Sequence, residues 1–339
     1  MGLLSRARDW PVMPEGKYRI EGLLGRGGMG AVYAARDLVL DRPVAIKVIR
    51  PELVPDPAAR ERFLREAQTL ARLTHPSIVR VFACGLLPDG GPYLVMELVR
   101  GVDLQRELVA EGRLEVSRAS RILAAACAAM ESAHRDGVLH GDLKPENILL
   151  PDDGGDDEED NEVAAKVLDF GVAQAIAMPD VQRRSGPEAR PPEWSGALGG
   201  PRPSTDARGA LSSVEGRERR REGVPGDEVP RTTGDTPIVG TPAYMAPEQL
   251  RGQPPSPGTD VFSLGVIAYE MLIGELPFGR GSAAEVALAQ ERGIPAGHLD
   301  RLPPALARAV TAALAIDADR RPVSAQALAH LIGAAAGGL

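Results

Sequence analysis

Several classes of protein are excluded by what this sequence lacks. Its two cysteines, Cys84 and Cys127, lie far apart among apolar neighbours, which is too few for a disulfide framework or a cysteine-rich metal site. The longest strongly apolar run, residues 261–273, is shorter than the roughly 20 residues that a bilayer span requires. The N-terminus has no apolar core long enough for a signal peptide. We therefore expect two core cysteines, a cytoplasmic location and no membrane span.

Charge of one sign is concentrated in a single short segment. The formal net charge is −8, but residues 152–162 contain eight of the 47 acidic residues, and the other 39 balance the 39 Lys and Arg. A chain without a general excess of basic charge does not attract the phosphate backbone of a nucleic acid electrostatically. The sequence therefore predicts no nucleic-acid binding. Its 339 residues suggest two folding units or one bilobal unit.

The apolar pattern changes along the chain. Residues 18–96 hold short β-like runs and one helical interruption, which Asp56 and Pro57 are placed to begin. Beyond Asp103 the apolar residues recur mainly at helical spacing. We therefore predict an α+β, bilobal fold, with a small β-rich N-lobe that carries one main helix and a larger helical C-lobe. The predicted boundaries are an N-terminal extension at 1–17, an N-lobe at 18–96, a hinge at 97–101, a C-lobe at 102–333 and a tail at 334–339.

Two stretches interrupt this pattern. Residues 152–162 form an acidic run between two β-like segments, which we interpret as a swollen, solvated hairpin loop; a cation or basic-partner site is the alternative. Residues 179–236 contain eight Pro, nine Gly, ten Arg and ten acidic residues, with few large apolar groups. Such a composition cannot bury enough surface to offset the entropy of ordering, so we expect this stretch to be disordered.

A glycine-rich motif, GRGGMGAV at residues 25–32, lies between two predicted strands. The glycine turn of a Rossmann unit opens a helix, whereas a strand–turn–strand version lets backbone N–H groups fold over phosphates. The sequence therefore favours a phosphate-covering turn. A glycine-rich hairpin without a ligand is the alternative that this motif alone leaves open.

Lys47 lies in the strand that follows, flanked by Ile46 and Val48. A strand lysine usually faces solvent, but Glu66 lies on the apolar stripe of the next helix, where an unpaired carboxylate is costly. The two residues are therefore predicted to pair, with the ammonium directed at an anionic ligand beneath the glycine turn.

Three oxygen-bearing side chains follow in the larger lobe. Asp142 and Asn147 lie in HGDLKPEN, between a helix and a strand, and Asp169 begins DFG after another strand. Their oxygens are hard ligands suited to Mg²⁺, and a carboxylate there can accept a hydroxyl proton. Each residue alone could simply form a turn. Together and in this order they indicate a chemical site.

With these motifs in this order, the sequence resembles the eukaryotic-type (Hanks-type) bacterial serine/threonine protein kinases over about residues 18–332. The resemblance implies a protein-kinase-like fold and Mg²⁺-dependent transfer of the ATP γ-phosphate to Ser and Thr hydroxyls of protein substrates, with autophosphorylation. It implies that Asp142 is the catalytic base, that Lys144 steadies the γ-phosphate, and that Asn147 and Asp169 bind Mg²⁺. The residues that it implies around ATP are Gly25, Gly27, Gly30, Val32, Ala45, Lys47, Glu66, Met96, Glu97, Val99, Asp103 and Leu149.

The resemblance also implies architectural roles. Glu248 would pair with Arg321, and Asp260 would hold the backbone of the catalytic loop. Lys144 and Thr241 together are typical of kinases that act on Ser and Thr rather than on Tyr. A stacked apolar column would link the lobes through His140, Phe170, Leu70 and Val81.

The sequence departs from the family at Gly141, where many members have an arginine that binds a phosphate on the activation loop. Its activation segment is also long, with 74 residues between Gly171 and Ala246. We therefore expect that phosphorylation of the three threonines that precede residues 240–248 does not switch the activity on. The unphosphorylated protein is expected to be active. These threonines are Thr232, Thr233 and Thr236.

Two other functions remain open at this point. A pseudokinase or scaffold could use the long loop to bind partners, although Lys47, Asp142 and Asp169 are all intact. A small-molecule phosphotransferase of similar fold is disfavoured by GTPAYMAPE at 240–248, which resembles a peptide-binding loop. The sequence specifies neither the physiological substrate, the activating signal nor the oligomeric state.

Overall fold

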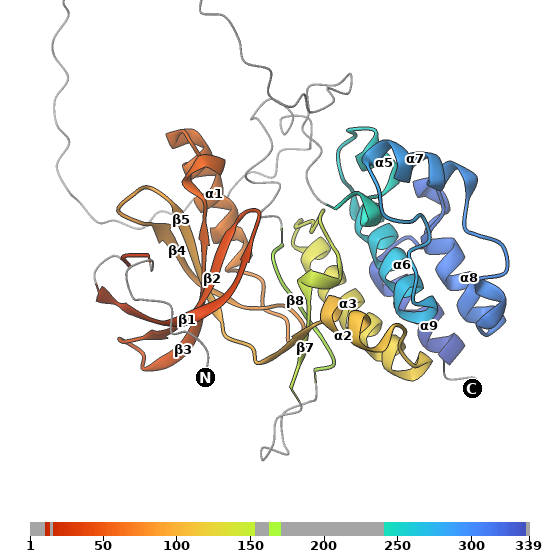
Figure 1. Ribbon diagram of the computed structural model, residues 1–339, viewed down its shortest axis with the longest axis horizontal. Coiled ribbons are helices and arrows are strands. Elements are labelled where there is room, and N and C mark those ends of the chain that lie inside the picture. The colour runs from red at the N-terminus through yellow and green to blue at the C-terminus, as the bar shows by residue number, and fades with distance from the viewer. Residues whose placement is uncertain (1–10, 14–15, 153–162, 171–240, 337–339) are drawn as a thin grey trace, which may run out of the picture. The chain divides into compact units, whose positions relative to one another are not determined.

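Figure 1 shows the computed structural model of the chain. It describes residues 11–13, 16–152, 163–170 and 241–336. Most of the acidic run and the whole stretch predicted to be disordered lie outside the described residues.

The N-terminal part is a five-stranded antiparallel sheet with one helix against it (Figure 1). Successive side chains of a strand point to opposite faces, so in β2 (Gly30–Asp37) Tyr33 and Ala35 are buried while their neighbours are half-buried. The sheet confirms the β-rich N-lobe. Its strands, in the order β1-β2-β3-β5-β4, are β1 (Tyr18–Gly27), β2 (Gly30–Asp37), β3 (Arg42–Ile49), β4 (Val81–Leu86) and β5 (Pro92–Glu97).

Helix α1 (Pro57–Leu70) packs against β4 and β5 and begins where the sequence predicted. The Ala59 N–H donates to Asp56 Oδ1 at 2.7 Å, and Pro57 takes the first helical position. A short 3₁₀ turn (Pro51–Leu53) precedes the helix. The apolar face of α1 buries Ala59, Phe63, Ala67 and Leu70.

The C-terminal part is helical, and α6 (Pro257–Ile273) lies at its centre. Every residue of α6 from Thr259 to Leu272 is buried, because α3 (Val116–Arg135), α8 (Pro304–Ala313) and α9 (Ala325–Ala336) pack around it (Figure 1). The apolar stripe of α3, which runs from Ala119 to Ala133, is buried as well. The other helices are α2 (Leu104–Glu111), α3 (Val116–Arg135), α5 (Pro247–Leu250), α7 (Ala283–Arg292), α8 (Pro304–Ala313) and α9 (Ala325–Ala336).

A three-stranded antiparallel sheet carries the segments that the sequence assigned to catalysis. In this sheet Ile148 of β7 lies opposite Val167 of β8, which confirms the hairpin predicted around the acidic run. Asn147 directly precedes β7, and Asp169 follows β8 after one residue. The hairpin therefore brings Asn147 and Asp169 to the same end of the sheet. Its strands are β6 (Gly101–Asp103), β7 (Ile148–Pro151) and β8 (Lys166–Val167).

Both cysteines are free thiols. Cys127 on α3 is fully buried, and burial raises the pKa of its thiol to about 12. Cys84 is only half-buried, because β4 is an edge strand of its sheet. The core position predicted for both cysteines is therefore confirmed for Cys127 alone. Within the described ranges, no helix combines the length and hydropathy needed to span a bilayer.

Candidate active site

A cavity of about 660 Å³ is lined by the five-stranded sheet, the chain that leaves β5, and the segments beside the three-stranded sheet. Of the sixteen predicted site residues, all of which the structure describes, only Glu66 does not line it. Thr241 also lines the cavity. The predicted residues on its walls are Gly25, Gly27, Gly30, Val32, Ala45, Lys47, Met96, Glu97, Val99, Asp103, Asp142, Lys144, Asn147, Leu149 and Asp169.

The glycine motif joins two strands and does not open a helix. Strand β1 ends at Gly27, β2 begins at Gly30, and the two pair as a hairpin. A Cβ at Gly30 would lie 1.9 Å from the carbonyl oxygen of Val48 on β3, so only glycine fits here. The Arg50 N–H donates to the Met29 carbonyl at 2.9 Å and ties the turn to the end of β3. This geometry is that of a strand–turn–strand motif rather than a Rossmann turn.

Lys47 and Asp169 meet across the cavity. Lys47 lies on β3 with 8% of its surface exposed, and its Nζ lies 2.6 Å from Asp169 Oδ2. Burial raises the pKa of the Asp169 carboxyl, but the charge and hydrogen bond of Lys47, together with the charges of His140 and Lys144, outweigh burial and hold that pKa below its usual value. The backbone φ of Asp169 is +61°, in the left-handed region that residues other than glycine rarely adopt. The pair therefore places an ionised carboxylate in a strained, fixed orientation.

Glu66, the predicted partner of Lys47, lies on α1 and is half-buried beside Ala67. Lys47 forms an ion pair with Asp169. The pairing of Lys47 with Glu66 therefore stays a prediction.

The loop before β7 holds three of the predicted residues together. Lys144 Nζ donates to Asp142 Oδ2 at 2.8 Å, and Asn147 Nδ2 donates to the Asp142 carbonyl, also at 2.8 Å. The Asp142 side chain is 13% exposed. This hydrogen bond uses the amide nitrogen of Asn147, and the amide oxygen, which only accepts, takes no part in it.

Asp260, on α6, holds the backbone that precedes Asp142. Its Oδ2 accepts from the His140 N–H at 3.0 Å and lies 2.7 Å from His134 Nε2, and its Oδ1 accepts from the Gly141 N–H at 2.8 Å. Burial raises the pKa of the Asp260 carboxyl, but the hydrogen bonds and the two histidines outweigh burial and hold the pKa below its usual value. The predicted anchoring role of Asp260 is confirmed. His134 was missed, because a histidine in the last turn of a helix carries no signal of its own.

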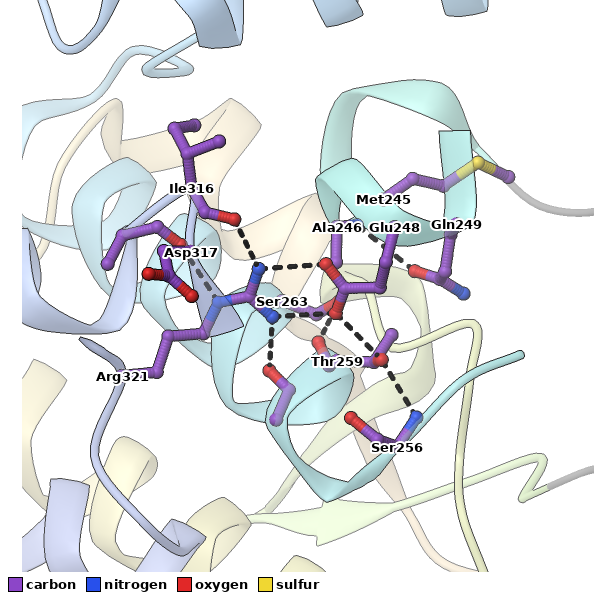
Figure 2. Close-up of polar contacts among 12 residues, drawn as sticks. Met245, Ala246, Glu248, Gln249, Ser256, Thr259, Ser263, Ile316, Asp317 and Arg321 are labelled. Atoms are coloured by element: carbon purple, nitrogen blue, oxygen red, sulfur yellow. Dashed lines mark hydrogen bonds and ion pairs between the residues drawn. The ribbon is translucent and has the colours of Figure 1, made fainter. Parts of the chain in front are cut away.

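The predicted pair of Glu248 and Arg321 is confirmed, and Figure 2 shows it at the centre of a polar network. Arg321 Nη1 lies 2.6 Å from Glu248 Oε1, and Nη2 lies 2.8 Å from Oε2. The Arg321 side chain is 0% exposed and the Glu248 side chain 13%. Thr259 Oγ1 also donates to Glu248 Oε1, at 3.0 Å. This network fixes the start of α5 against α6.

The chain between the lobes begins with Met96 and Glu97 at the end of β5. Met96 is buried. The Glu97 carboxylate pairs with Lys166 Nζ at 2.7 Å and accepts from the Arg80 N–H at 3.3 Å. The Glu97 side chain is thus engaged within the fold.

Asp103 also has a structural role. Its Oδ1 accepts from the Arg106 N–H at 2.9 Å and so caps α2, and its Oδ2 lies 3.1 Å from Arg106 Nε. An aspartate directly before a helix is a common capping signal, which could have revealed this role. Asp103 therefore serves the fold as well as lining the cavity.

The residues of the predicted apolar column come together. Leu70, Val81 and Phe170 line one small cavity of about 20 Å³. The His140 ring lies 5.0 Å from that of Phe170, and its Nε2 lies 2.8 Å from the Leu168 carbonyl oxygen.

The sequence matches the family model of the protein kinase domain over residues 18–197 and 226–332. It is 35% identical over 316 residues to serine/threonine-protein kinase pkn3 of Myxococcus xanthus, which covers 92% of this chain and 48% of that protein. It is 35% identical over 312 residues to serine/threonine-protein kinase PknB of Mycolicibacterium smegmatis, covering 90% of this chain and 40% of PknB. The chain thus spans less than half the length of these curated relatives.

Among solved structures, the fold is similar to that of the kinase domain of Mycobacterium tuberculosis PknI. The TM-score is 0.62 at 22% sequence identity, over 94% of this chain and 96% of the PknI chain. At this identity the likeness concerns the fold.

Proposed function

Because the chain belongs to the protein kinase family, we propose that it is a serine/threonine protein kinase. It transfers the γ-phosphoryl group of ATP to Ser and Thr hydroxyls of protein substrates, and to its own. The observation that carries this proposal is the cavity, in which the glycine turn, Lys47, Asp142 and Asp169 line one space. Such a space suits a nucleotide whose phosphates meet both a cation and the acidic groups of the reaction.

ATP lies, in this proposal, with its phosphates beneath the glycine turn. A turn of Gly residues lets main-chain N–H groups approach an anion closely, because no side chain covers them. Lys47 supplies positive charge for the α and β phosphates, and Glu66 orients Lys47. Apolar surface for the adenine ring comes from Val32, Ala45 and Leu149, which line the same cavity.

The hinge and the residues that follow it bind the adenine and the ribose. Met96 closes the end of the cavity next to the sheet, and the main chain from Glu97 to Val99 binds the adenine edge. The Glu97 side chain is engaged with Lys166, and the Glu97 N–H donates to the Arg80 carbonyl at 2.9 Å, so the proposed contact of this residue with the ring falls to its carbonyl. Asp103 contacts the ribose while it caps α2.

Asp142 is the proposed catalytic base. A substrate hydroxyl that reaches its carboxylate gives up its proton as the oxygen attacks the γ-phosphorus, and the bond to the β-phosphate breaks. The Lys144 ammonium, 2.8 Å from Asp142, both fixes that carboxylate and offsets charge on the phosphoryl oxygens.

The family uses a divalent metal ion with ATP, and we propose Mg²⁺ at Asn147 and Asp169. Among the described residues, no group of three or more His, Cys, Asp or Glu could hold a metal by itself. That donor set fits Mg²⁺, which is usually bound through one or two carboxylates together with substrate phosphates. The ion, when bound, neutralises phosphate charge as the γ-phosphoryl group is transferred.

Lys144 and Thr241 support Ser and Thr as the acceptors, since both line the cavity beside Asp142. We also propose that residues 18–333 form the kinase domain, with insertions at 152–162 and 179–236. The unmatched gap in the family model, residues 198–225, falls inside the second of these. Every residue that the proposed catalysis requires is present, so the sequence gives no support to the alternative of an inactive scaffold.

Transfer of labelled phosphate from Mg²⁺ and ATP to a generic basic protein, followed by phosphoamino-acid analysis, tests the proposal. We expect phosphoserine and phosphothreonine with the wild type and none with Lys47→Met. Absence of transfer from a folded wild-type protein would support the scaffold. Labelling of small hydroxyl compounds in place of protein would support a small-molecule phosphotransferase.

A further inference from the structure

We propose that Gln249 is a positioning residue that ties the catalytic loop to the substrate-binding segment without a phosphate. The inference rests on the proposed kinase function and assigns a role to a residue that the sequence did not single out. Gln249 lies on α5, directly after Glu248, and is half-buried.

Both ends of the Gln249 amide are used. Its Nε2 donates to the Gly141 carbonyl at 2.7 Å, and its Oε1 accepts from the Ala246 N–H at 3.0 Å. Figure 2 shows the second of these contacts beside the pair of Glu248 and Arg321. A main-chain carbonyl only accepts and a main-chain N–H only donates, so these partners fix the orientation of the amide. The side chain therefore spans two segments that lie 108 residues apart in sequence.

At the catalytic end, Gln249 completes the fixation of Gly141. The Gly141 N–H is held by Asp260 at 2.8 Å, and its carbonyl is held by Gln249. The backbone φ of Gly141 is +71°, a region that glycine adopts without strain. The carbonyl of Gly141 belongs to the planar peptide unit that leads into Asp142. Holding that carbonyl therefore sets the direction in which the backbone enters the proposed base.

At the other end of the link, the segment that leads to Ala246 is itself held by hydrogen bonds. Ser263 Oγ donates to the Tyr244 carbonyl and Gln290 Nε2 donates to the Met245 carbonyl, each at 2.8 Å. The Tyr244 hydroxyl donates to Glu270 at 2.6 Å. Gln249 therefore links the catalytic loop to a rigid support rather than to a mobile one.

This link explains how the loop can be ordered when Gly141 offers no guanidinium. In a kinase with arginine at this place, a phosphate on the activation segment bridges that segment to the catalytic loop. Here a neutral side chain makes the bridge, and its partners are main-chain groups that are present in every phosphorylation state. The ordering of Asp142 is thus independent of loop phosphate.

Gln249→Glu tests the link with little change of shape. The variant keeps an oxygen for the Ala246 N–H but replaces the donor to Gly141 with a carboxylate oxygen, so the link becomes repulsive. Gln253→Glu is the matched control, since Gln253 is exposed nearby and receives the same charge change. Gln249→Met, which removes both hydrogen bonds without adding charge, separates the lost link from the added charge.

The measurements are kcat and KM for ATP, with phosphatase-treated enzyme and a fixed peptide, together with hydrogen exchange of the peptide that contains Gly141. We expect both Gln249 variants to lower kcat about tenfold or more, the scale of one hydrogen bond lost in the transition state. KM for ATP stays within about twofold, exchange at Gly141 and Asp142 rises, and Gln253→Glu resembles the wild type.

A kcat within about twofold of the wild type in both Gln249 variants, with unchanged exchange, would overturn the inference. So would a loss of about a hundredfold in the wild type on phosphatase treatment, because phosphate would then be the link. If the wild type transfers no phosphate at all, the proposed function fails, and the exchange measurement still decides whether Gln249 holds the loop.

Discussion

At the scale of single residues, the fixed points of this site are positions where only one residue type fits. Gly30 is such a position, because a Cβ there would clash with the carbonyl oxygen of Val48. Gly28, two residues earlier, is not, since a Cβ there would meet nothing within 4 Å. Gly30→Ala is therefore expected to push β2 away from β3 and to weaken ATP binding about tenfold or more, whereas Gly28→Ala changes it little. Titration with a fluorescent ATP analogue measures both affinities. Equal effects of the two substitutions would contradict this account of the turn.

The pair of Glu248 and Arg321 makes a second prediction at this scale. Arg321→Met leaves an almost buried carboxylate without its counter-charge, and we expect the free energy of unfolding to fall by about 3–5 kcal/mol. Replacing both residues with Met removes the unpaired charge, so the double variant should be more stable than Arg321→Met alone. Urea unfolding compares the three proteins. A double variant that is less stable than the single one would show that the charge is not what matters.

At the scale of elements, how well a helix could be predicted depends on how much apolar surface it buries. Helix α1 was predictable because Asp56 and Pro57 mark its start and its apolar stripe is continuous. Helix α7 was missed, since it buries only Val286 and Gln290. Its capping box was the available signal, with Ser282 N–H donating to Glu285 Oε2 at 2.8 Å.

In the site, too, some features could be predicted from the sequence and others could not. Residues within contiguous motifs, such as Asp142 and Asn147, could be expected from sequence to share one site, and both line the cavity. Contacts made by single polar residues on separate helices, such as His134 with Asp260 and Gln249 with Gly141, depend on tertiary packing. No local pattern specifies such pairs, so they required the structure.

Helix α6 holds the backbone that precedes Asp142 through Asp260, and this predicts that the stability of the protein depends on pH. The folded pKa of Asp260 lies below that of an unfolded aspartate, about 3.9, so its contribution to stability is complete above that pH and disappears as the pH falls through the folded pKa. We expect Asp260→Asn to lower the free energy of unfolding by about 2–3 kcal/mol near neutral pH. The difference between wild type and variant should shrink at about pH 3. Urea unfolding at both pH values tests this, and a constant difference would contradict it.

At the scale of the whole molecule, the family match and the structural likeness confirm the bilobal α+β fold that the motifs predicted. The unmatched residues 198–225 predict a further outcome, because closure entropy grows only slowly with loop length. Deleting them should leave kcat within a few-fold of the wild type. Steady-state phosphorylation of a peptide measures this, and a loss of about a hundredfold would give the insertion a catalytic role.

The central claim is that this cavity performs phosphoryl transfer with Asp142 as its base. The most direct test is the rate of peptide phosphorylation by Asp142→Asn, with Asp300→Asn as a control at an exposed site and circular dichroism to verify folding. We expect Asp142→Asn to lose a factor of about 10² to 10⁴ in kcat and Asp300→Asn to keep the wild-type rate. A folded Asp142→Asn protein that phosphorylates at nearly the wild-type rate would contradict the claim.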